Sequence, residues 1–162
     1  MNRSIALGLV FSALATNVAL AQTSKGTLEL EVSRASEGEL EVVLKNRSSD
    51  RVKVSAVFNE NPAFGVLNFN LSEGGHRYGP TFPPNENLPT DSAYISLGPG
   101  DAFGHIYSIA DLMHSYEAKS ACVTLVVTYR DRLAAKFRAF DGSIKARPIR
   151  ICSSRQGQVR GV

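Results

Sequence analysis

The stretch that decides the fold is Ser92–Arg130, SAYISLGPGDAFGHIYSIADLMHSYEAKSACVTLVVTYR. Its pattern predicts a strand, a Gly-Pro-Gly turn, a second strand, one short helical turn near residues 111–116, and a long final strand. In that final strand Val123, Leu125 and Val127 alternate with two threonines and a valine. β-branched and aromatic residues dominate it, which is typical of a strand buried on at least one face. Such a strand needs partners on both sides, so we expect the rest of the chain to supply them.

Alternating apolar and polar residues predict further strands. Four of them lie at Thr27–Ser33, Glu39–Asn46, Arg51–Phe58 and Gly65–Leu71. Nearer the C-terminus, the runs Leu133–Phe140 and Ser143–Ile151 flank Asp141-Gly142, a dipeptide that favours a tight hairpin turn. The alternative for the start of the first run, LAAKF, is a short helix, because Ala-Ala-Lys has good helix propensity. Pro148 places the second run at a sheet edge or at a bulge. Seven to nine short strands predict a single all-β domain, an antiparallel β-sandwich.

The first 21 residues have the pattern of a cleaved secretory signal peptide. Arg3 supplies a positive charge, Ile5–Leu14 is apolar, and Ala19-Leu20-Ala21 is an Ala-x-Ala cleavage site. An uncleaved membrane anchor is the alternative, but the apolar run is shorter than the about 20 residues that a spanning helix needs. We therefore expect export to the bacterial periplasm or the extracellular space. The folded domain is expected over residues 22–152, followed by a flexible tail over residues 153–162.

The chain contains two cysteines, Cys122 and Cys152. In an oxidising compartment an even pair is most simply a disulfide, and two buried free thiols are the alternative. Neither cysteine belongs to a Cys-x-x-Cys motif or to a Cys/His cluster. Redox catalysis and a zinc site are therefore not predicted, and no cofactor is expected.

Charge is distributed unevenly along the sequence. Residues 22–129 contain 8 Lys and Arg against 13 Asp and Glu, whereas residues 130–162 contain 9 against 2. The predicted C-terminal hairpin is therefore basic, and its Arg138, Lys145 and Arg147 are candidate contacts for an anionic envelope component or an acidic protein. Nucleic acid is not expected, because the compartment is wrong and no aromatic residues interleave with the charges. The alternative is internal compensation by glutamates of the first two strands, namely Glu29, Glu31, Glu39 and Glu41.

The least regular stretch is Ser72–Thr90, SEGGHRYGPTFPPNENLPT, with three glycines and four prolines. Loops of this length within a compact domain are usually functional or mobile. Aromatic residues and arginines anchor many recognition surfaces, so four residues of the loop are candidate contacts for a protein partner. They are His76, Arg77, Tyr78 and Phe82. The alternative is a loop that folds back over one end of a sheet as a plug.

Several landmarks occur together in this chain. They are LEVVLKNRSSDRVKV, the Gly-x-x-Tyr-Gly-Pro sequence from Gly75 to Pro80, Leu97-Gly98-Pro99-Gly100-Asp101, and Asp111-Leu112 with Tyr116 before the long strand. Residues 27–130 thereby resemble the immunoglobulin-like domain that precedes the catalytic domain of deuterolysin and peptidyl-Lys metalloproteases. The same domain occurs alone in small bacterial inhibitor-like proteins. The resemblance implies an immunoglobulin-like β-sandwich with an inhibitor-like or recognition role. It does not extend to a peptidase, because the sequence has no His-Glu-x-x-His motif.

Catalytic chemistry is not predicted from the sequence. No nucleophile elbow or local triad occurs. His105, Asp111 and His114 are the residues that most suggest a metal site, but their spacing matches no standard zinc pattern. We expect instead that Asp111 caps the short helical turn, where aspartate is a favoured first residue.

Two further features are interpreted as structural. Tyr116 is expected to pack at the corner before the long strand, with its hydroxyl bound to the backbone. The Asn-x-Ser sequences at Asn46 and Asn70 are interpreted as turn residues and not as glycosylation sites.

The sequence as a whole predicts an exported, non-enzymatic binding domain. The first hypothesis is a protease-inhibitor-like or protein-recognition module that binds a protein partner, for which a protease is one candidate. The alternative is an accessory subunit that pairs through a strand edge or binds anionic envelope components through the basic C-terminal hairpin.

Overall fold

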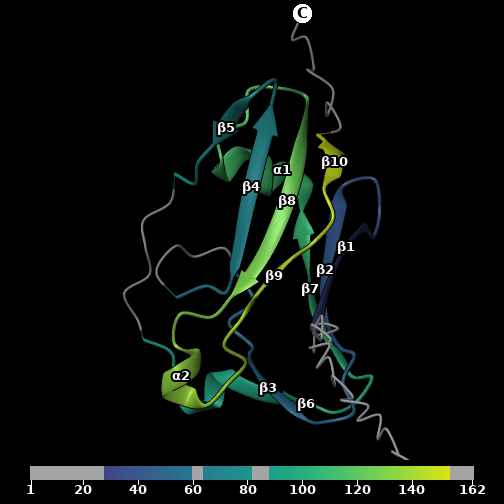
Figure 1. Cartoon of the computed structure of the whole chain (residues 1–162). Helices are drawn as coiled ribbons and strands as arrows, with labels where there is room; N and C mark the ends of the chain where they lie inside the picture. Colours follow the sequence, from purple (N-terminus) through teal and green to yellow (C-terminus); the bar gives the residue numbers. More distant parts are fainter. Residues whose placement is uncertain (1–27, 60–63, 82–87, 154–162) are drawn as a thin grey trace, which may run out of the picture.

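The computed structural model describes residues 28–59, 64–81 and 88–153, which form antiparallel sheets with short helices at their ends (Figure 1). The first sheet has the order β1-β2-β7, with bounds β1 Leu28–Arg34, β2 Glu39–Asn46 and β7 Ala102–Ser108. The second has the order β10-β8-β4-β5, and β9 also pairs with β8. Its strands are β4 Leu67–Glu73, β5 His76–Tyr78, β8 Cys122–Arg130, β9 Ser143–Lys145 and β10 Ile149–Cys152.

The remaining elements are short. A two-stranded sheet pairs β3 (Val52–Ser55) with β6 (Tyr94–Leu97), which follows a 3-10 turn over Asp91–Ala93. Helix α1 (Ile109–Ser115) joins β7 to β8, and α2 (Ala134–Phe137) follows β8. No helix in the described part of the chain is long and apolar enough to cross a membrane.

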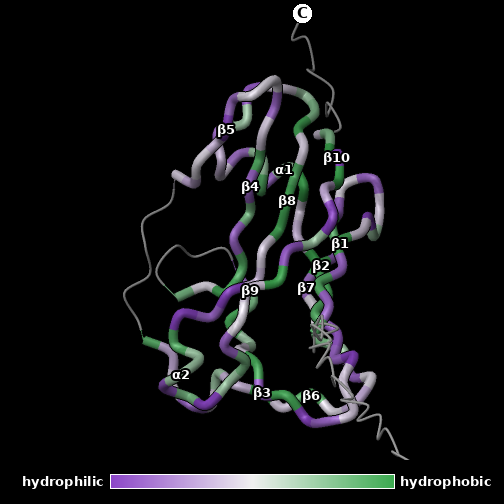
Figure 2. Tube along the Cα trace, in the orientation of Figure 1, coloured by the Kyte–Doolittle hydropathy of each residue, from purple (hydrophilic) through white to green (hydrophobic). Residues whose placement is uncertain are grey.

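The core lies between the two larger sheets. Strand β2 buries every second side chain, Leu40, Val42 and Leu44, and β8 does the same with Val123, Leu125 and Val127. In Figure 2, β4 alternates between hydrophilic and hydrophobic residues in the same way. The orders β1-β2-β7 and β10-β8-β4-β5 correspond to strands A-B-E and G-F-C-C′ of an immunoglobulin-like sandwich. The predicted all-β sandwich is therefore confirmed.

Strand β8 is the long strand that the sequence predicts, and it has partners along both edges. Strand β4 pairs with one edge, while β9 and β10 lie end to end along the other. Between them, the Ala146 N–H donates to the Val127 carbonyl. Pro148, two residues after Ala146, has no N–H to donate, so the edge strand is interrupted there.

Two local predictions are wrong. Residues 133–140 do not form a strand of a hairpin, because the returning chain pairs with β8 instead. The alternative of a short helix in Leu133–Phe137 is confirmed, since Ala134–Phe137 is helical. The stretch 72–90 is not all loop, since Gly74 and Gly75 form a turn with positive φ angles of 54° and 86° that leads into β5. Glycine reaches these angles without steric cost, so the turn closes a tight hairpin between β4 and β5.

The ends of α1 also differ in detail from the prediction. Ser108, and not Asp111, is the N-cap, because the Ser108 hydroxyl accepts a hydrogen bond from the Asp111 N–H at 3.2 Å. Asp111 lies in the first turn, where its negative charge interacts favourably with the helix dipole. The Tyr116 ring is buried at the corner before β8, as expected.

The predicted disulfide is confirmed. Cys122 and Cys152 are directly opposite each other in the pairing of β8 with β10, and their sulfurs are bonded. The bond closes a loop with a sequence separation of 30 residues, which contains α2 and β9. It therefore fixes the C-terminal edge strand to the central strand of its sheet.

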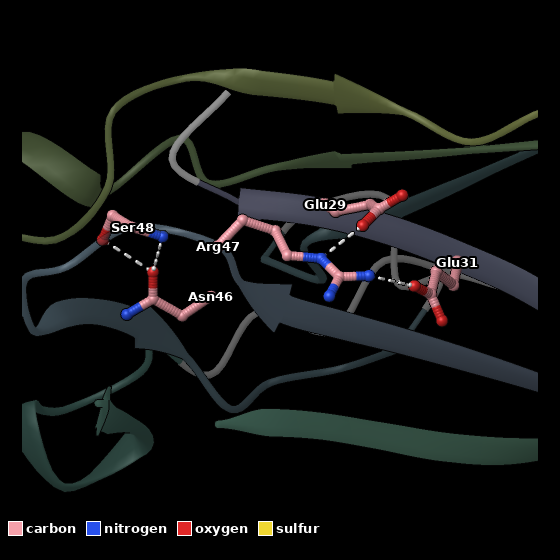
Figure 3. Close-up of polar contacts among 5 residues, drawn as sticks. All are labelled: Glu29, Glu31, Asn46, Arg47 and Ser48. Carbon is pink, nitrogen blue, oxygen red and sulfur yellow. Dashed lines mark hydrogen bonds and ion pairs between the residues drawn. The ribbon is translucent and has the colours of Figure 1, made fainter. Parts of the chain in front are cut away.

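A buried asparagine connects several turns through hydrogen bonds. Asn46, at the end of β2, has no exposed area, and its Nδ2 lies 2.7 Å from the Asp50 carbonyl and 3.0 Å from those of Leu97 and Gly98. Its Oδ1 accepts hydrogen bonds from the N–H and the hydroxyl of Ser48 (Figure 3). The interpretation of Asn46 as a turn residue is therefore confirmed. It is wrong for Asn70, which lies within β4.

Replacing Asn46 by alanine is expected to lower the free energy of unfolding by about 3 kcal/mol, because several buried carbonyl groups lose their donor. Asn70→Ala is the matched control, since Asn70 is exposed and its replacement should change stability by about 0.5 kcal/mol or less. Urea denaturation of both variants measures the difference. Equal effects of the two substitutions would contradict the role assigned to Asn46.

The pH dependence of stability is expected to involve Tyr129. This side chain is fully buried, and its burial raises the pKa of the phenol above the usual range. The nearby Asp131 carboxylate raises the pKa further, whereas the hydrogen bond that the Ser55 N–H donates to the phenol oxygen lowers it. The unfolded state therefore loses the phenolic proton first, at a pH of about 10, and the free energy of unfolding falls as the pH rises further. Tyr129→Phe removes this ionisation. Between about pH 9 and pH 11, its urea midpoint should fall less than that of the wild type; an equal fall would contradict the prediction.

Candidate functional site: the outer face of the five-stranded sheet

The solvent side of the second sheet gathers cations from distant parts of the sequence. Its members point outward because they alternate with the buried residues of the same strands. We call this surface the basic face; its cations are Arg77 on β5, Arg130 on β8, Lys145 on β9 and Arg150 on β10. All four are exposed.

Strand pairing arranges these residues in rows. Arg150 is opposite Thr124, Thr124 is opposite Ser72, and Ser72 is opposite Arg77. An arginine therefore stands at each end of a row of hydroxyl groups, and the two Cα atoms are three strand spacings, or about 14 Å, apart. A second row, about 13 Å along the strands, consists of Lys145, Thr128 and Asn68.

The centre of the basic face is polar and shallowly hollowed. A groove there is lined by Arg77 and Lys145 at its margins and by residues of β4 and β8 between them, namely Asn70, Leu71, Ser72, Val126 and Thr128. The Asn70 amide donates to Asn68 Oδ1 at 2.7 Å, so these two side chains are held together. The surface offers hydroxyl, amide and cationic groups, and no outward position of its described strands carries a carboxylate.

The glutamates of the first sheet lie on its outer face. The outer face of β1 and β2 carries Glu29, Glu31, Glu39 and Glu41. Two of these, Glu29 and Glu31, form ion pairs with Arg47, whose Nε and Nη2 lie 2.6 and 3.0 Å from their carboxylates (Figure 3). In the described part of the chain, no ion pair involves a cation of the basic face. Among the described residues, none of these glutamates forms an ion pair with Arg77, Lys145 or Arg150, although Glu29 and Lys145 line the same groove at the sheet edge.

The sequence-predicted binding residues fall into separate groups. Arg77 and Lys145, from the predicted loop and the predicted hairpin, meet on the basic face. Arg147 lines a second groove, at the sheet edge, together with Lys145 and with Leu28, Glu29 and Leu30 of β1. Arg138 is the C-cap of α2, which lies at the end of the molecule opposite β5 (Figure 1).

The aromatic part of the predicted loop site is arranged differently from the expectation. Tyr78 is half-buried against the core, with its hydroxyl 3.4 Å from the Ser120 hydroxyl. The exposed His76 ring packs edge-on against Tyr78 at a centroid distance of 4.8 Å. Tyr78 thus contributes to packing, and Phe82 lies outside the described residues.

His105, Asp111 and His114, the three residues that most suggest a metal site in the sequence, lie on two different elements. His105 lies on β7 with its ring against Tyr107, whereas Asp111 and His114 lie in α1. Among residues 28–59, 64–81 and 88–153, no group of three His, Cys, Asp or Glu side chains is placed to hold a metal ion.

Sequence reasoning missed Arg130 and Arg150 as site residues, although both belong to the basic C-terminal segment. The alternation of Thr124, Val126 and Thr128 indicates an outer face for β8. The alternation does not show which strands lie next to β8. The pairing of β8 with β10 and β4, and of β4 with β5, brings Arg77 onto the same surface as Arg150.

Comparison with known proteins adds no family. No family model matches the chain, and a search of curated proteins returned no match. Neither comparison links the chain to the domain of deuterolysin that its landmarks resemble.

Proposed function

We propose that this domain is an exported binding module that holds an anionic polymer of the cell envelope on its basic face. The observation that carries the proposal is the gathering of Arg77, Lys145 and Arg150 on one sheet surface whose outward strand positions have no carboxylate. Phosphate groups are the favoured ligands, because guanidinium groups bind them through paired hydrogen bonds.

The shape of the surface favours an extended ligand. Arg77 and Arg150, whose Cα atoms are about 14 Å apart across the strands, are spaced to contact successive charges of a chain. The hydroxyl and amide groups between them supply hydrogen-bond donors to the same chain. No aromatic side chain lies at the outward strand positions of this face, so the stacking typical of neutral-sugar or single-stranded nucleic acid binding is not available there.

Export is part of the proposal. It is supported by the signal-peptide pattern of the first residues and by the Cys122–Cys152 disulfide, which is typical of oxidising compartments. The protease-inhibitor hypothesis stays a prediction. It follows from the resemblance to the immunoglobulin-like domain, with the stretch 72–90 as the expected contact loop. Part of that stretch is strand β5, in which Tyr78 is half-buried.

Binding is expected to depend on the basic face more than on net charge. The double variant Arg77→Gln/Lys145→Gln should weaken binding to inorganic polyphosphate roughly tenfold, because two charged contacts are lost. The slope of log affinity against log salt concentration should also decrease, by up to about two. Fluorescence titration at several salt concentrations measures both quantities.

The matched control is Lys136→Gln/Arg138→Gln, which removes the same charge from α2. It should bind polyphosphate nearly as well as the wild type, because α2 lies away from the basic face. Equal losses in the two double variants would show that binding follows net charge and would contradict the proposal. An absence of binding to polyphosphate and to lipopolysaccharide at low salt would also overturn it.

A further inference from the structure

The groove at the centre of the basic face has neutral polar groups between two cations. Its volume is about 300 Å³, and Arg77 and Lys145 lie at its margins. These two residues are separated by three strand spacings and by about 13 Å along the strands, so their Cα atoms are about 19 Å apart. The residues of β4 and β8 that line the groove between them carry no charge. The surface therefore presents a positive charge, a neutral stretch and a second positive charge.

The neutral stretch offers hydrogen-bond acceptors as well as donors. The Asn70 Nδ2 donates to Asn68 Oδ1 at 2.7 Å, and among the described residues the Asn70 Oδ1 accepts no hydrogen bond. The Ser72 and Thr128 hydroxyls of the groove can each donate and accept. A phosphodiester has acceptor oxygens and no donor, so it cannot donate to Asn70 Oδ1. A ligand that uses both kinds of group must therefore carry donors of its own.

Val126 is a second feature that does not suit a purely ionic ligand. Its side chain points outward from β8 between those of Thr124 and Thr128, and it is half-buried. It lies opposite Asn70 in the pairing of β8 with β4, and both line the groove. Covering its remaining apolar surface is favourable with C–H groups, whereas charged oxygens lose hydration there. An amide acceptor beside an aliphatic side chain matches a neutral unit that contains both hydroxyl and C–H groups.

We propose that the ligand of the basic face is a polyol-phosphate or sugar-phosphate polymer, in which hydroxylated carbon units alternate with phosphodiesters. This inference rests on the proposed function and names the chemical class of its polymer. Arg77 and Lys145 bind phosphates, and Asn70 accepts a hydrogen bond from a hydroxyl of the stretch between them. C–H groups of the same stretch cover Val126. Inorganic polyphosphate can contact the two cations, but it has no hydroxyl donors along its chain and no carbon.

The test compares two polymers that have the same spacing of charges. One is poly(ribitol phosphate), and the other is a synthetic poly(pentanediol phosphate) of equal length, which lacks the hydroxyl groups. Fluorescence anisotropy of the end-labelled polymers, titrated with the mature, oxidised protein at one salt concentration, measures both dissociation constants. The expected result is roughly tenfold tighter binding of the ribitol polymer, because it gains one or two net hydrogen bonds. The pentanediol polymer is the more apolar, so nonspecific hydrophobic binding acts against this result.

Asn70→Ala should remove most of the preference. The affinity for poly(ribitol phosphate) should fall roughly fivefold because the amide is lost, whereas the affinity for poly(pentanediol phosphate) should fall at most about twofold. Asn70 is exposed, so the variant should fold normally, and circular dichroism checks this. Ser96→Ala is the control, since Ser96 is an exposed polar residue on β6, in another sheet. It should keep the full preference.

The outcomes separate this inference from the proposed function. Equal affinities of the wild type for the two polymers would overturn the inference, and so would a preference that persists in Asn70→Ala. In either case, weaker binding by Arg77→Gln/Lys145→Gln would still support the proposed function. Failure of both polymers to bind at low salt would overturn both.

Discussion

The pairing of β8 with both of its neighbours is the constraint on which the rest of the structure depends. Strand side chains alternate between the two faces of a sheet, so a slip of one residue would move Val123, Leu125 and Val127 from the core to the solvent. The cost of exposing these buried residues fixes the register against β4 and β10. The same register aligns Arg150, Thr124, Ser72 and Arg77 in one row on the outside. The candidate site is therefore a consequence of core burial on the opposite face of the same sheet, and the disulfide at Cys122 and Cys152 holds the outermost strand in that register.

The sequence predicted the fold well where one face of a strand is buried and the other is exposed to solvent, as in β1, β2, β4 and β8. It failed where two physical tendencies compete. Residues 133–140 contain both β-forming aromatics and helix-forming Ala-Ala-Lys. The strand that would be their partner in a hairpin, Ser143–Lys145, pairs with β8 instead, and Ala134–Phe137 forms a helix. Gly74-Gly75 favours a hairpin turn, but the prolines that follow concealed β5 within an apparently irregular stretch. The site itself was only half predictable, because local alternation shows which way Arg77 points and not which strands lie next to β5.

The two outer faces of the sandwich have opposite electrostatic character. The outer side of β1 and β2 carries glutamates, and Arg47 forms ion pairs with two of them (Figure 3). The basic face has no such internal partner among the described residues. The overall net charge is only +3, but the positive and negative side chains are distributed unevenly between the two outer faces. Such a molecule orients in the field of an anionic surface with its basic side inward, which raises the rate of productive encounters without any change in net charge.

Exposed cations on a flat sheet give weak individual contacts, since each is well solvated and screened by salt. An extended polymer meets several of these cations at once. After one cation of the basic face holds one charge of the polymer, the next contact is intramolecular and costs less translational entropy. Strand pairing fixes the spacing of Arg77, Lys145 and Arg150, so the affinity is expected to depend on how well the charges of the polymer match that spacing. The same shallow face is therefore expected to bind a single small anion weakly and an extended polyanion more strongly.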